Sequence, residues 1–228
     1  MAGLGTHGVS IGTLTAEILG VPYLDLARRE RPKGGMESVP QLAELPNRCR
    51  LGDVVLIWIV IDSLLKPPLR VLRFLPRRYA RYGILCPRAV FSSRRPKRIL
   101  QRIESFFTWR FRNLLIRVFG NEQVEDAKYE QALDEAVAAL LAKGCRPVLV
   151  GHAAVSGRYF YGSSGTYDRH RKIVCRVAEL NGQTYVPADQ ILDRWDDYVQ
   201  DRIHPNERGH RKLAKFVERA LDGPPNAN

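Results

Sequence analysis

Apolar residues follow two alternating patterns along the chain, and this alternation predicts an α/β domain. Residues 54–60 (VVLIWIV) form a continuous run of β-forming side chains, which is typical of a strand buried on both faces of a parallel sheet. Residues 123–143 have apolar positions at helical spacing, and Gly144 follows them. A second short apolar run comes directly after, over residues 146–150. This order is that of a strand, a crossover helix and a parallel strand.

The same alternation continues on either side of these elements. We expect a short helix over residues 13–19 and a strand over 22–27 before them, and a helix over about 168–180 and a strand over 184–187 after them. A final amphipathic helix is expected from about residue 205 to 221. The pattern predicts one α/β domain over residues 1–221 with a parallel sheet, and a frayed tail over 222–228.

A basic insertion interrupts this order between the strand at 54–60 and the helix at 123–143. The whole chain carries 36 Lys and Arg against 24 Asp and Glu, a net charge of +12. Residues 66–117 contain 15 of the basic residues and a single acid, Glu104. Prolines divide the first part of the insertion (66–119), whereas residues 99–119 are expected to form one helix with an apolar side.

The charge of the insertion indicates an anionic partner. Arginines beside Phe106, Phe107, Trp109 and Phe111 favour an anionic membrane surface, and the alternative is a solvated basic face. Nucleic acid is a weaker interpretation because no known nucleic-acid module accompanies the charge. The chain starts without the basic and apolar regions of a signal peptide, which predicts a cytoplasmic protein, either free or peripheral at the inner membrane surface.

The four cysteines are far apart and show no metal-ligand spacing. They are Cys49, Cys86, Cys145 and Cys175. We therefore expect reduced thiols, no metal site and no cofactor.

The most specific short motif is Asp201-x-x-His204-Pro205-Asn206, placed just before the last amphipathic helix. An Asp three residues before a His can accept the proton of Nδ1, which leaves Nε2 available as a general base. The alternative is that Asp201 only caps the turn and His204 is a solvated loop residue.

With Gly209-His210 following it, this motif resembles the C-terminal block of the SGNH (GDSL-type) hydrolases and acyltransferases. The resemblance implies a flavodoxin-like three-layer α/β/α fold, with Asp201 and His204 serving a serine on the first βα turn. Residues 60–62 match the family's third block. The implied activity is hydrolysis or transfer of an ester. Residues 61–64 also resemble, more loosely, a mycobacterial sugar octanoyltransferase branch, which suggests a sugar or lipid ester as substrate.

The chain departs from the family in its first and third blocks. The family's Gly-Asp-Ser is absent, so the candidate nucleophiles are Thr6 and Ser10, and Ser10 is alternatively a helix N-cap. Ile61 stands where the family has an Asn that donates to the oxyanion, with Asp62 after it. Backbone N–H groups near Gly34 and Gly35 must then compensate.

One further residue is a candidate substrate contact. His152 follows the strand at 146–150, at the edge where α/β sheets bind ligands, although a histidine bonded to loop backbone is the alternative.

Two functions therefore remain open. One is an SGNH-type esterase or acyltransferase acting on a small-molecule or glycolipid ester. The other is a catalytically inactive protein of the same fold that binds a membrane surface, an anionic glycan or a protein through its insertion.

Overall fold

The computed structural model describes residues 10–22, 39–75, 87–193 and 195–222. In these residues three strands form one parallel sheet in the order β1 (Val54–Ile57), β2 (Arg146–Val150), β3 (Thr184–Val186). Leu56 lies opposite Val148, and Leu149 lies opposite Tyr185. The predicted parallel sheet is therefore present, with β2 at its centre.

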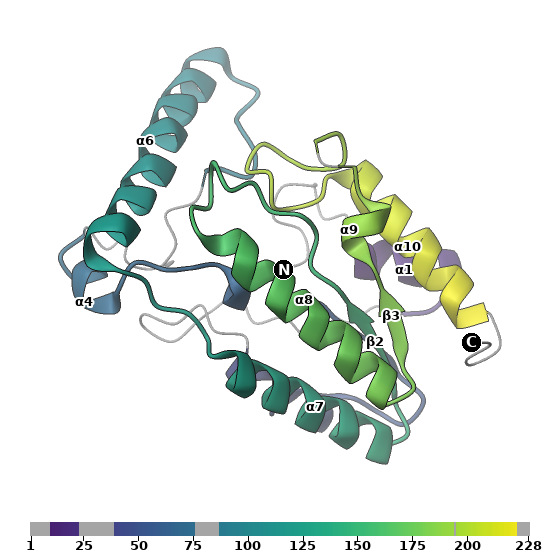
Figure 1. Cartoon of the computed structure of the whole chain (residues 1–228). Coiled ribbons are helices and arrows are strands. Elements are labelled where there is room, and N and C mark those ends of the chain that lie inside the picture. Colours follow the sequence, from purple (N-terminus) through teal and green to yellow (C-terminus); the bar gives the residue numbers. More distant parts are fainter. Residues whose placement is uncertain (1–9, 23–38, 76–86, 194, 223–228) are drawn as a thin grey trace.

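Two helices cover each face of this sheet. Helices α7 (Asp126–Ala142) and α8 (Ser163–Leu180) pack on one face, and α1 (Ile11–Leu19) and α10 (Glu207–Asp222) pack on the other (Figure 1). Alternate residues of β2 point into the two cores. Leu149 belongs to the α7/α8 core, whereas Val148 and Val150 belong to the α1/α10 core. The fold is thus a three-layer α/β/α arrangement, as predicted.

Short helical segments connect these main elements. They are α2 (Val39–Leu42), α3 (Leu45–Arg48), the 3-10 turn η1 (Ile61–Ser63), α4 (Leu69–Leu72) and α9 (Ala188–Ile191). The turn η1 follows β1 and α9 follows β3, so both lie beyond the carboxyl ends of their strands.

Several boundaries differ from those predicted. Strand β1 ends at Ile57 instead of residue 60, because the chain turns into η1 shortly afterwards. Helix α8 begins at Ser163, five residues early, after Gly162 with its positive φ of 72°. Most of the strand predicted over residues 22–27 lies outside the described residues. Helix α10 includes Asp222, which the sequence had assigned to the frayed tail.

The insertion leaves the body of the fold and returns to it at one point. Lys66 and Glu122 exchange two backbone hydrogen bonds of 3.0 and 2.8 Å. Between them runs helix α6 (Arg95–Phe119), which stands to one side of the sheet layers (Figure 1). It begins four residues earlier than predicted, because Pro96 fits the first turn of a helix, where no N–H is needed. None of the helices in the described ranges combines the length and the apolarity that a membrane crossing requires.

The central position of β2 gives a test of the fold. Leu149 is fully buried, so Leu149→Ala is expected to lower the free energy of unfolding by about 2–5 kcal/mol. Leu180→Ala, at the exposed end of α8, is the matched control and should change it by less than about 0.5 kcal/mol. Urea unfolding followed by circular dichroism measures both. Equal effects of the two substitutions would contradict the assignment of β2 as the core strand.

Candidate active site

The Asp201 and His204 motif lies in a tight hairpin before α10. Tyr198 and Pro205 form an antiparallel bridge at its base, and the Val199 N–H donates to the His204 carbonyl over 2.9 Å. Arg202 at the tip has a φ of 60°, the left-handed conformation that closes the turn. The hairpin therefore fixes the backbone on both sides of the histidine.

Asp201 holds the imidazole of His204 in place. Its Oδ1 accepts the backbone N–H groups of Ile203 and His204, each over 3.0 Å, and its Oδ2 bonds Nδ1 of the His204 ring. The carboxylate is buried, whereas the imidazole is partly exposed. A proton on Nδ1 satisfies this geometry and leaves Nε2 as a free base. Nε2 is itself buried, although other atoms of the ring are exposed, and it has no hydrogen-bond partner within the described residues. The hydrogen bond predicted from the spacing is present.

A second histidine lies behind this pair. His210, in the first turn of α10, is buried with its ring edge-on to Trp58 at a centroid distance of 6.2 Å. Burial, followed by the nearby charge of His204, lowers the pKa of His210 to about 4. His210 is therefore neutral at pH 7 and adds no positive charge beside the base.

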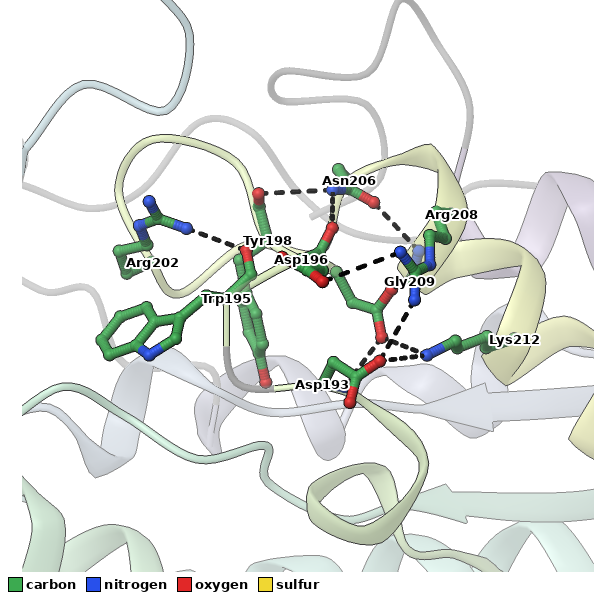
Figure 2. Close-up of polar contacts among 10 residues, drawn as sticks. Asp193, Trp195, Asp196, Tyr198, Arg202, Asn206, Arg208, Gly209 and Lys212 are labelled. Carbon is green, nitrogen blue, oxygen red and sulfur yellow. Dashed lines mark hydrogen bonds and ion pairs between the residues drawn. The ribbon is translucent and has the colours of Figure 1, made fainter.

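A network of ion pairs fastens the hairpin to α10 (Figure 2). The fully buried carboxylate of Asp197 lies 3.0 Å from Nε of Arg208 and 2.6 Å from Nζ of Lys212. Asp193 approaches the same two cations at 3.2 and 2.9 Å. Hydrogen bonds to the two carboxylates raise the pKa of Lys212. Two cations on one helix thus hold the segment that leads into the hairpin.

Close backbone packing completes this attachment. The side chain of Asn206 accepts the Gly209 N–H over 3.0 Å, and it donates to the carbonyl of Asp196 over 2.7 Å (Figure 2). A Cβ at Gly209 would lie 2.5 Å from the Asp197 carbonyl oxygen, which is far inside van der Waals contact. Only glycine fits at this position.

Ser10 is the N-cap of α1, the alternative left open by the sequence. Its Oγ accepts the Thr13 N–H over 3.1 Å, and the Ser10 N–H in turn donates to Oγ1 of Thr13 over 2.7 Å. Ile11, next in the chain, packs in the α1/α10 core with Val150 and Tyr198, at the carboxyl end of β2. Ser10 and the hairpin therefore lie toward the same edge of the sheet. No hydrogen bond joins Ser10 to His204 in the described structure.

Two other predicted site residues are about as deeply buried as Ser10, which is 2% exposed. Asp62 is completely buried in η1, and His152 is 1% exposed, so neither side chain can touch a substrate in this conformation. For His152, burial replaces the predicted substrate contact with a role inside the protein. Thr6, Gly34 and Gly35 lie outside the described residues.

A buried chain of hydrogen bonds was not predicted. Oγ of Ser63 lies 2.5 Å from Nε2 of His152 and 2.8 Å from Nδ1 of His170, and Nε2 of His170 lies 3.3 Å from Oδ1 of Asp126. One proton arrangement satisfies these contacts: His152 donates to Ser63, Ser63 donates to His170, and His170 faces the carboxylate through Nε2–H. Burial lowers the pKa of both histidines, that of His152 to about 3.

Serine, histidine and aspartate are the residue types of a hydrolase triad, but Ser63 is fully buried, and Ser10, at 2% exposed, is scarcely more accessible in this conformation. The chain of bonds instead joins η1 to the segment after β2 and to α8. No sequence spacing could have revealed it, because its members are 89 and 107 residues apart. Across the described ranges, no group of three or more His, Cys, Asp or Glu side chains is placed to hold a metal ion.

Comparisons with known proteins give only partial matches. No protein-family profile and no curated protein matches the chain. Among solved structures, an alpha/beta hydrolase named LAE5, from the metagenome of Lake Arreo, is 24% identical with a TM-score of 0.39 over 50% of this chain and 55% of that one. Axe2, an acetylxylan esterase from Geobacillus stearothermophilus, is 21% identical with a TM-score of 0.37 over 46% of this chain and 52% of that one. The matched part thus spans about half of each structure's length.

The contact at Gly209 predicts that the hairpin is sensitive to one methyl group. Gly209→Ala is expected to lower the free energy of unfolding by about 1–3 kcal/mol, because Cβ collides with the Asp197 carbonyl. In the control, Gly165→Ala in α8, Cβ meets only a side-chain tip at 3.7 Å, so stability should be unchanged or higher. Thermal unfolding of both variants distinguishes the two cases, and a neutral Gly209→Ala would contradict the close packing.

The low pKa of His210 predicts how stability depends on pH. Between its ordinary value of 6.5 and about 4, the unfolded chain binds a proton at His210 that the native protein does not. Neutral His210 therefore causes no loss of unfolding free energy above pH 6.5, and the unfolding free energy decreases as the pH falls from 6.5 toward 4. Removing this group by His210→Gln should reduce the slope of unfolding free energy against pH by up to about 1.4 kcal/mol per pH unit in this interval. Urea titrations from pH 4 to 8 give the unfolding free energy of the wild type and of His210→Gln. Parallel curves of this free energy against pH would contradict the burial of His210 as a neutral imidazole.

Proposed function

We propose that the protein hydrolyses or transfers an acyl ester, with Ser10 as nucleophile, His204 as general base and Asp201 as the group that orients the base. The observation that carries the proposal is the Asp201–His204 pair, in which the carboxylate engages Nδ1 and Nε2 has no hydrogen-bond partner among the described residues. This is the division of roles that nucleophilic catalysis requires of a histidine. The combination of this pair with the family's C-terminal motif supports an SGNH-type enzyme.

In this mechanism Nε2 of His204 takes the proton of the Ser10 hydroxyl as Oγ attacks the ester carbonyl carbon. The tetrahedral intermediate collapses when the protonated imidazole gives its proton to the leaving alkoxide. A water or an acceptor hydroxyl then removes the acyl group by the same steps in reverse. Ser10 is only 2% exposed in the structure, and its Oγ accepts the Thr13 N–H. A rearrangement that exposes Ser10 and turns its hydroxyl away from Thr13 therefore precedes the attack.

Backbone groups supply the oxyanion donors in this proposal. Ile61 is apolar and buried, so the side-chain donor of the third block is missing. Helix α1 begins directly after Ser10, and the first N–H groups of a helix have no intrahelical acceptor and carry the positive end of the helix dipole. A carbonyl oxygen bound near Ser10 would be stabilised there, together with the expected N–H groups near Gly34 and Gly35.

The substrate we propose is a small-molecule or glycolipid ester. One observation favours the second candidate function, a catalytically inactive protein that binds through its insertion. The Ser10 hydroxyl is occupied in a complete capping box, as in a helix N-cap with no chemical role. The two functions are distinguished by whether Ser10 reacts.

The first experiment measures turnover of a short-chain aryl ester. His204→Ala and Ser10→Ala should each lower kcat by about 10³-fold or more, and Asp201→Asn by about 10²–10⁴-fold because the orienting charge is lost. Ser164→Ala is the matched control, since this serine is exposed in the first turn of α8 and should leave turnover unchanged. Circular dichroism verifies that each variant is folded.

The second experiment identifies the nucleophile directly. A fluorophosphonate should label the protein once, and mass spectrometry should locate the adduct on Ser10, with no label after His204→Ala. An adduct on Ser63 would overturn the assignment and move the site to the buried His152 and His170 pair. No adduct and no turnover in the wild-type protein would favour the inactive, binding function.

A further inference from the structure

One face of α6 exposes apolar side chains along the whole helix. Eight of them lie within a stripe about 140° wide at 100° per residue. Each of the eight side chains is at least 41% exposed. Single exposed apolar residues are normal on a protein surface, but a continuous apolar stripe marks an interaction site. The stripe consists of Ile99, Leu100, Ile103, Phe106, Phe107, Phe111, Leu114 and Val118.

The opposite face of α6 is fixed to the body of the protein. Arg112 is fully buried, and its guanidinium donates to the Leu65 carbonyl over 2.5 Å. Asn113 accepts the Tyr161 N–H over 3.3 Å and donates to the Arg158 carbonyl over 3.1 Å. Leu115 and Ile116 are buried beside them. The orientation of the helix is therefore set, and the apolar stripe cannot turn inward without breaking these bonds.

Cations lie on both sides of the stripe and, at Arg117, within it, and the only acid of the helix is neutralised. Exposed basic side chains lie near both ends and in the middle of α6: Arg95, Lys97, Arg102 and Arg117. Glu104 is paired with Arg88 at 2.5 Å. The exposed side of the helix thus combines apolar surface with positive charge that no acidic residue of α6 offsets.

Arginine and aromatic side chains are also stacked at this surface. The guanidinium of Arg110 lies 3.4 Å from the ring centroid of Phe106 and 4.0 Å from that of Trp109. A pocket of about 380 Å³ opens beside them, lined by Arg110, Arg117 and Arg158 together with Trp109 and Tyr161. Such a pocket suits an anionic headgroup, since arginine binds phosphate oxygens in a bidentate manner.

We propose that α6 lies flat on an anionic lipid membrane, with its apolar stripe in the headgroup and acyl boundary and its cations on the headgroups. Both halves of the surface match this partner: the stripe has the amphipathic pattern of an interfacial helix, and the flanking charge is opposite to that of the lipid. A second copy of the chain fits less well, because two such faces would bring like charges together. This inference does not depend on the proposed ester chemistry.

The membrane-binding surface is connected to the candidate active site. The N–H of Gln200, in the Asp201–His204 hairpin, donates to the carbonyl of Ala89 in the insertion over 3.2 Å. The segment that leads into α6 is therefore in contact with the hairpin.

The test is co-sedimentation of the full chain with vesicles of phosphatidylcholine alone or with 30% phosphatidylserine added. Binding is expected only with phosphatidylserine, and it should weaken steeply between about 0.01 and 0.5 M salt as the screening length falls from about 30 Å to below about 8 Å. The charge variant should weaken partitioning by about tenfold or more. It combines Arg95→Ser, Lys97→Ser, Arg102→Ser and Arg117→Ser.

Matched controls separate this surface from the general charge of the protein. A second variant removes four exposed basic residues from other surfaces and should bind nearly as the wild type does: Arg50→Ser, Lys128→Ser, Lys215→Ser and Arg219→Ser. A third removes apolar contacts without changing charge and should also lose binding: Ile103→Ser, Phe107→Ser and Leu114→Ser. All substituted side chains are exposed, so folding should be retained, which circular dichroism verifies.

Three results would overturn the proposal. Equal losses in the two charge variants would mean that net charge alone drives binding, and unchanged binding in the apolar variant would mean that the stripe does not enter the lipid. Failure of the wild-type protein to sediment with anionic vesicles would by itself exclude the membrane as partner, and dimerisation in analytical ultracentrifugation that the apolar variant abolishes would then assign the stripe to a second copy. Esterase activity is not measured in these assays, so their outcome is independent of the proposed function.

Discussion

Both faces of β2 are closed to solvent, and the arrangement of the other elements depends on this burial. Val148, Leu149 and Val150 are each no more than 1% exposed, so each face of the strand must be covered by helices. Parallel pairing with β1 and β3 then brings the carboxyl ends of all three strands to one edge. The segments that follow the strands carry η1, His152 and the hairpin, and this is why the polar side chains of interest gather there.

Features that depend on short spacings could be predicted from the sequence. The bounds of β2 agree at both ends, because its apolar run is short and is bordered by Gly144 and Gly151. The Asp201–His204 hydrogen bond follows from a separation of three residues, which a single turn closes whatever the rest of the fold does. The insertion was recognisable because its charge differs so strongly from that of the remaining chain.

Features that depend on tertiary contacts could not be predicted in this way. The bonds of Ser63 to His152 and His170 require the sheet and α8 to be assembled first. The ion pairs around Asp197 join two segments whose charges, in the sequence, resemble any solvated surface. Helices α8 and α6 were both predicted as helices, but each begins earlier than predicted. The first turn of each contains residues that the sequence pattern assigns to a loop: Ser163 after Gly162 in α8, and Pro96 in α6.

The four histidines within the described residues lie in two contrasting environments. His152, His170 and His210 are buried and have lowered pKa values, so they act as neutral polar groups within the core. His204 is partly exposed and is bonded to the buried carboxylate of Asp201 through Nδ1. The same side chain therefore contributes packing at three positions and proton transfer, in the proposed mechanism, at one.

The paired backbone hydrogen bonds of Lys66 and Glu122 make the insertion a closed excursion from the fold. Because the chain departs and returns between two residues that are already bonded to each other, a change in the length of what lies between them has little influence on the geometry of the sheet, provided that the buried face of α6 is kept. Related chains could lengthen, shorten or exchange this excursion while keeping the same three layers. The exposed side of the insertion is thus free to diverge in evolution faster than the body, whereas the bonds from Gln200 to Ala89 and from Arg112 and Asn113 to the body are points where a change in one affects the other.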